Sequence, residues 1–129
     1  MQLIIKQLDN PIDLHIHFDI EQLKGRLRNN QTAISQILAL IKSNLEQPTA
    51  KMIDEMKSFV ETGNIDGLRL VAHKLKGTAQ SSCFSRLAEL SKTIQNLADS
   101  DKALLIKAIE DIVAEVEFLK KHLSQYTLV

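Results

Sequence analysis

The last third of the chain carries a helical hydrophobic repeat, which constrains the fold more than any other sequence feature. From about residue 101 to residue 124, apolar side chains recur alternately four and three positions apart, as on one face of an α-helix. They are Leu105, Ile109, Ile112, Val116, Leu119 and Leu123. Ser100 is placed to cap the start of this helix, and Lys120 and Lys121 lie where the helix dipole favours positive charge.

Earlier segments repeat this spacing. The apolar stripes are Ile20, Leu23 and Leu27; Ile34, Ile37, Leu38, Ile41 and Leu45; Met52, Met56, Phe59 and Val60; Ile65, Leu68, Ala72, Leu75 and Ala79; and Phe84, Leu87, Leu90 or Ser91, Ile94 and Leu97. Asn64 is an expected N-cap after the helix breaker Gly63, and Pro48 either kinks one long helix or begins a second. The pattern predicts an all-α protein, an antiparallel four-helix bundle with a short additional N-terminal helix.

The length of 129 residues predicts one domain, and only residues 14–18 hint at the alternation of a strand. We expect residues 1–17 to form an N-terminal arm and residues 18–129 to form the helical bundle. Sixteen basic and sixteen acidic side chains cancel, so charge gives no reason to expect nucleic acid or a membrane as partner. With one cysteine and no signal peptide or membrane span, a cytoplasmic monomer is expected.

Several kinds of chemistry leave no trace in the sequence. It contains no glycine-rich phosphate loop, no G-x-S-x-G elbow and no His-Glu-x-x-His pair. Asp111 and Glu115 are expected on a solvated surface, and His15 and His17 as surface or packing residues of the arm. We therefore expect neither a metal site nor a cofactor site in this chain.

One helical face is unusual. Because a helix turns by about 100° per residue, Leu70, His73, Gly77 and Gln80 share a strip that points away from the buried stripe of the same helix. Glycine is about 1 kcal/mol worse than alanine in a helix, and here it removes the side chain that would lie beside the imidazole. Lys74 and Lys76 add two positive charges within one turn.

This strip suits reversible phosphorylation of His73. A neutral imidazole nitrogen is a good nucleophile near physiological pH, and a nearby lysine can offset the charge of the phosphoryl group. A bare backbone at Gly77 would let a partner protein approach the ring. The alternative is that the histidine is chemically silent and that Gly77 is only the C-cap of its helix.

The segment 72–77, Ala-His-Lys-Leu-Lys-Gly, resembles the His-x-x-Lys-Gly motif of histidine-containing phosphotransfer (HPt) domains in multistep phosphorelays. In that family the motif lies on the second helix of a four-helix bundle. The similarity spans roughly residues 18–122. It includes Phe18-Asp19-Ile20 followed by Leu23, Ile37-Leu38, the acidic segment 52–60, Leu87 and the segment 94–97.

The resemblance implies that His73 is the phosphoacceptor, that Lys76 interacts with the phosphoryl group and that Gly77 admits the partner. Gln95 stands where some members place a polar side chain near the histidine. Cys83 replaces a frequent glycine at the corner into the next helix, which puts the turn geometry in doubt. Gln80 replaces a small residue, which puts the closeness of docking in doubt.

The resemblance implies a phosphocarrier rather than an enzyme with a complete active site. It would receive a phosphoryl group from a response-regulator receiver domain and pass it to another, within a pathway that begins at a sensor or hybrid histidine kinase. The Mg²⁺ that assists transfer is expected on the receiver. The residues of this chain that we expect to contact the receiver protein are Leu70, Lys74, Gln80 and Gln95. Two alternatives stay open: the phosphoacceptor domain of a chemotaxis-type kinase, and a helical adaptor without phosphotransfer.

Overall fold

The computed structural model describes residues 3–5, 16–123 and 126–128, and within them six helices and two short strands. The helices are α2 (Ile20–Arg26), α3 (Gln31–Glu46), α4 (Pro48–Thr62), α5 (Ile65–Ser81), α6 (Ser85–Leu97) and α7 (Lys102–Leu123), and the strands are β1 (Leu3–Ile5) and β2 (Tyr126–Leu128).

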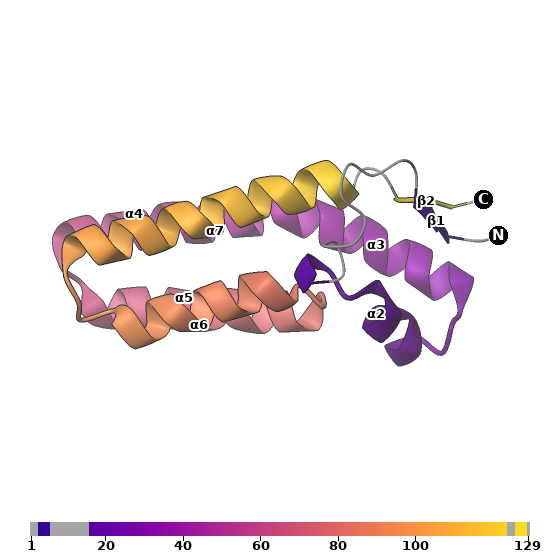
Figure 1. Cartoon of the computed structure of the whole chain (residues 1–129), viewed down its shortest axis with the longest axis horizontal. Coiled ribbons are helices and arrows are strands. Elements are labelled where there is room, and N and C mark those ends of the chain that lie inside the picture. The colour runs from indigo at the N-terminus through magenta and orange to yellow at the C-terminus, as the bar shows by residue number, and fades with distance from the viewer. Residues whose placement is uncertain (1–2, 6–15, 124–125, 129) are drawn as a thin grey trace.

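The helices form two layers (Figure 1). Helices α5 and α6 lie side by side in one layer, and α7 runs back along α4 and α3 in the other. Because α4 contacts α5 and α7, and α6 contacts α5 and α7, helices α4–α7 close into a four-helix bundle. The short α2 lies beside the end of the α5–α6 layer, so the predicted all-α bundle with an additional N-terminal helix is confirmed.

Local sequence signals explain where the helices begin and end. Pro48 is the first residue of α4, so this proline begins a second helix instead of kinking one long helix. Gly63 ends α4 with a φ of 72°, in the left-handed region that glycine adopts without a steric penalty. Asn64 caps α5 as expected, and its side chain accepts a hydrogen bond of 2.9 Å from the Gly67 N–H. Helix α7 begins at Lys102, so Asp101, not Ser100, directly precedes it.

The buried face of each helix follows the predicted stripes closely. All six stripe residues of α7 are buried, as are Leu68, Ala72, Leu75 and Ala79 of α5. In α6 it is Ser91 rather than Leu90 that is fully buried. The prediction was wrong for Ile65, which is 39% exposed because it occupies the first turn of α5, at the end of the bundle.

The two chain ends add an element that the sequence did not reveal. Strand β1 pairs with β2 in antiparallel register, with Ile4 opposite Thr127 (Figure 1). Strands of three residues are too short to establish a period of two, which explains why they were missed. His15 and the other residues 6–15 of the proposed arm lie outside the described residues, so the boundary of the arm at residue 17 stays a prediction.

Candidate functional site

The predicted strip on α5 is present as a solvent-exposed face. Leu70, His73, Gly77 and Gln80 are all exposed, and Leu70 retains 56% of its surface. We call these four residues the His73 strip. The neighbouring Val71 and Ala72 are buried, so the strip is the outer face of a helix that is anchored by its opposite side.

Helix α6 supplies the polar neighbour of the imidazole. Gln95 Nε2 lies 3.5 Å from His73 Nδ1, within hydrogen-bonding distance of the ring. Gln95 is half-buried and His73 exposed, and the amide contacts Nδ1 and not the other ring nitrogen, Nε2. The predicted proximity of Gln95 to His73 is therefore present in the structure.

The two lysines of the motif lie on different flanks of the strip. Lys76 is half-buried, whereas Lys74 is exposed and lines a groove on the side of α3 and α4. Within the described part of the chain neither lysine forms an ion pair, so both ammonium groups are available to an incoming anion.

Gly77 lies inside the helix. Helix α5 continues to Ser81, so the alternative in which Gly77 is a C-cap is wrong. A Cβ built at Gly77 would meet no atom within 4 Å. Among the described residues no neighbour therefore requires a glycine there, and the open space lies next to the imidazole of His73, one turn earlier on the same face.

A groove adjoins the strip on the side of Lys74 and Gly77. Its volume is about 700 Å³, and the side chains of Ile37, Leu40 and Met52 line it from α3 and α4. Leu40 is 55% exposed. The sequence analysis missed this contribution of α3. The available signal was that Leu40 is a large apolar residue off the buried stripe of its helix.

Comparison with known proteins identifies the architecture. A family model described as Hpt domain matches residues 31–126, about three quarters of the chain. The chain belongs to the Hpt domain family. Comparisons with curated proteins and with solved structures found no match.

Membership in the Hpt family supports a histidine phosphotransfer role in phosphorelays. Hpt domains are phosphocarriers and not classical enzymes, and they generally interact with receiver domains and histidine kinases. None of the helices in the described residues combines the length and the apolar composition needed to cross a bilayer.

The corner after the Hpt motif explains what Cys83 does in place of the family's frequent glycine. Cys83 has a φ of 60°, a left-handed conformation that glycine adopts most easily. Its carbonyl accepts a hydrogen bond of 2.9 Å from the Asp19 N–H. The turn therefore keeps the shape suited to glycine, and the thiol is buried. Burial raises the pKa of this thiol, an effect that Arg26 opposes and Asp19 reinforces.

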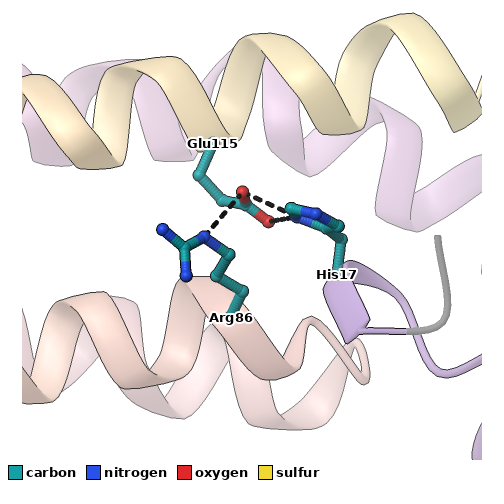
Figure 2. A network of polar contacts seen from close by, with 3 residues as sticks. All are labelled: His17, Arg86 and Glu115. Atoms are coloured by element: carbon teal, nitrogen blue, oxygen red, sulfur yellow. Dashed lines mark hydrogen bonds and ion pairs between the residues drawn. The ribbon is translucent and has the colours of Figure 1, made fainter. Parts of the chain in front are cut away.

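A second histidine lies in a more tightly bonded environment (Figure 2). His17 Nδ1 lies 2.7 Å and 2.8 Å from the two carboxylate oxygens of Glu115 on α7. Arg86 Nε on α6 lies 3.6 Å from Glu115 Oε1. The His17 ring also packs on Phe118, with 3.9 Å between centroids. We call His17, Arg86 and Glu115 the N-terminal joint, because they attach the segment before α2 to two helices of the bundle.

The position of Glu115 in the joint differs from the sequence-based expectation, whereas the position of His17 agrees with it. Glu115 was expected on a solvated surface, but it is only 4% exposed, because it faces the interior between α6 and α7. Burial raises the pKa of this carboxyl, while His17 and Arg86 counteract the rise. His17 is a packing residue, as expected. No group of three potential metal ligands occurs among the described residues, and Asp111 pairs instead with Lys107 at 2.8 Å.

Proposed function

We propose that this Hpt domain is a phosphorelay intermediate in which His73 carries the phosphoryl group. His73 would take this group from a receiver-domain aspartate and pass it to the aspartate of a second receiver. The observation that supports this most directly is an exposed imidazole one turn before a helical glycine with open space above it, within a chain of the Hpt family.

The transfer step needs only one nucleophile from this chain. A lone pair of His73 Nε2, the ring nitrogen that Gln95 does not contact, attacks the phosphorus of the aspartyl phosphate. The N–P bond forms while the bond from phosphorus to the aspartate oxygen breaks, and the carboxylate leaves with the bonding electrons. The reverse reaction loads the next receiver. The Mg²⁺ and the acidic pocket that would stabilise the transferring group are expected on the receiver.

Gln95 supports the assignment of Nε2 as the reacting nitrogen. For Nε2 to hold a lone pair, Nδ1 must carry the ring proton. The amide of Gln95 lies on the Nδ1 side at 3.5 Å, and with its oxygen turned toward the ring it would accept that proton. Gln95 is then a positioning residue that selects the reactive tautomer.

The receiver is expected to dock over the His73 strip. Leu70 would supply an apolar anchor, Lys74 a charge beside the groove and Gln80 a contact near the corner, while Gly77 leaves room for close approach. Lys76 would contact the phosphoryl group. The protein is proposed to act as a monomer in a pathway that starts from a sensor or hybrid histidine kinase.

The test is a transfer assay with receiver domains that have been charged with acetyl phosphate. Wild-type protein should acquire acid-labile phosphate, and the variant His73→Gln should acquire none while keeping its helical circular-dichroism spectrum, because His73 lies off the core. Equal labelling of His73→Gln would overturn the assignment and leave His15, His17 and His122 as acceptors. Labelling by isolated kinase domains but not by receivers would instead favour the chemotaxis-type alternative, and no acid-labile label with any donor would favour the adaptor.

A further inference from the structure

Two contacts fix how α5 and α6 are aligned beside His73. Gln95 Nε2 of α6 lies 3.5 Å from His73 Nδ1 of α5, and Arg69 Nη2 of α5 lies 3.6 Å from Oδ2 of Asp99, which follows the end of α6 by two residues. Arg69 comes four residues before His73, and Asp99 comes four residues after Gln95. Both contacts fit one antiparallel register of the closely packed α5 and α6, and we extend this register along their shared edge.

The same register identifies the residues on the other side of His73. Three positions after His73 on α5 is Lys76, and the matching position, three before Gln95 on α6, is Lys92. Three helical residues advance about 4.5 Å, which is within reach of the flexible four-carbon stem of a lysine. Lys92 thus stands across from Lys76, beside His73. We call this row of facing residues the α5–α6 seam.

Among the described residues, charges are paired on one side of His73 along the seam and unpaired on the other. On one side of His73, Asp99 pairs with Arg69. On the other side, neither Lys76 nor Lys92 forms an ion pair with any described residue, including Glu89, one turn before Lys92. Two facing ammonium groups repel each other, and an anion placed between them removes that repulsion. A phosphoryl group on His73 brings close to two negative charges to this place.

We propose that Lys92, together with Lys76, binds the phosphoryl group on His73, so that the seam holds it between one ammonium group from each helix. This inference rests on His73 being the phosphoacceptor. It adds a second binding residue from α6, outside the sequence motif. Lys57 provides the control, because it is an exposed lysine on α4, outside both the His73 strip and the seam.

The experiment uses phosphoramidate as a small phosphoryl donor, so that no receiver is needed. Its phosphoryl group passes to the imidazole nitrogen, its own P–N bond breaks and ammonia leaves. The ³¹P NMR signal of phospho-His73 is assigned by its absence in His73→Gln, and its titration gives the second pKa of the phosphoryl group. Nearby positive charges favour the dianion, so we expect this pKa to rise by at least about 0.3 in Lys92→Gln.

The controls separate this proposal from the proposed function. Lys92→Arg, which keeps the charge, should restore the wild-type titration, and Lys57→Gln should leave it unchanged. An unchanged titration in Lys92→Gln, or an equal rise in Lys57→Gln, would overturn the role of Lys92 while leaving His73 as acceptor. Failure of His73 to become phosphorylated by phosphoramidate or by receivers would instead overturn the proposed function, and this inference with it.

Discussion

The two histidine environments of this Hpt domain differ in almost every structural respect. His73 is exposed and has a neutral amide at 3.5 Å, whereas the His17 side chain is 17% exposed and contacts a buried carboxylate at 2.7 Å. The shorter contacts and the raised pKa belong to the N-terminal joint, which has a structural role in attaching the segment before α2. A residue that must be reached by another protein is expected to have few internal contacts. Many close contacts around a histidine therefore mark the structural joint, whereas exposure of the imidazole to solvent marks the candidate reactive site.

Breaking the joint should cause the largest loss of stability. In Glu115→Ala, His17 and Arg86 lose their shared partner in a partly buried place, so we expect the free energy of unfolding to fall by about 2 kcal/mol. Urea unfolding measures this change. Phosphotransfer through His73 should continue at the wild-type rate in the folded protein. Glu117→Ala is the control, because Glu117 is 67% exposed on the same helix. A loss no larger than that of the control would contradict a structural role for the joint.

Gly77→Gln should impair phosphotransfer and leave the stability of the fold intact, the reverse of what we expect for Glu115→Ala. The new side chain would occupy the space beside His73, so we expect the rate of transfer from a receiver to fall at least about tenfold. Stability should be unchanged or rise by up to about 0.5 kcal/mol, since glutamine forms helix better than glycine. Transfer assays and melting curves on the same variant measure both. Gly25→Gln in α2 is a control, because it also has no atom within 4 Å of the added Cβ. A destabilised Gly77→Gln variant with normal transfer would contradict a docking role.

Leu70→Asp tests whether the exposed leucine is part of the docking surface. We expect receiver binding to weaken about tenfold, or about 1.4 kcal/mol, with little change in melting temperature. Titration with a receiver domain measures the affinity. Leu104→Asp on α7 is the matched control, since Leu104 is 53% exposed on a different helix. Equal weakening in both variants would mean that negative charge alone, and not the position of Leu70, reduces binding.

Most of the fold could be predicted because each helix has its own hydrophobic stripe, which depends only on nearby residues. The features of the candidate site that lie within one helix were predictable for the same reason, as with His73 and Gly77 on one strip of α5. Pairing between distant segments was not. The β1–β2 pair and the alignment of Lys76 with Lys92 depend on how the elements pack, which no local period encodes.

Glu115 shows how a local signal can exist and still be insufficient. It stands three residues after Ile112 and four before Leu119, so its position lies on the buried face of α7. A charged glutamate is usually found at the surface, whereas the spacing of position 115 from Ile112 and Leu119 predicts a place in the core. The position was decisive, because His17, 98 residues away in sequence, provides the partner that a buried carboxylate requires.

The smallest effect that we expect is a pH dependence of the free energy of unfolding that comes from the buried Glu115 of the joint and not from exposed carboxylates. Burial raises the pKa of Glu115 in the folded protein, so folding favours its protonated form. Its contribution to stability is present at a pH below the ordinary glutamate range and is lost as the pH rises through the raised pKa. Glu115→Gln cannot lose this proton. The free energy of unfolding of the wild type, minus that of Glu115→Gln, should therefore decrease as the pH rises from acidic toward neutral. Urea unfolding across this range measures the difference, and Glu117→Gln controls for general charge effects. A difference that stays constant or increases with pH would show that His17 and Arg86 outweigh burial at Glu115.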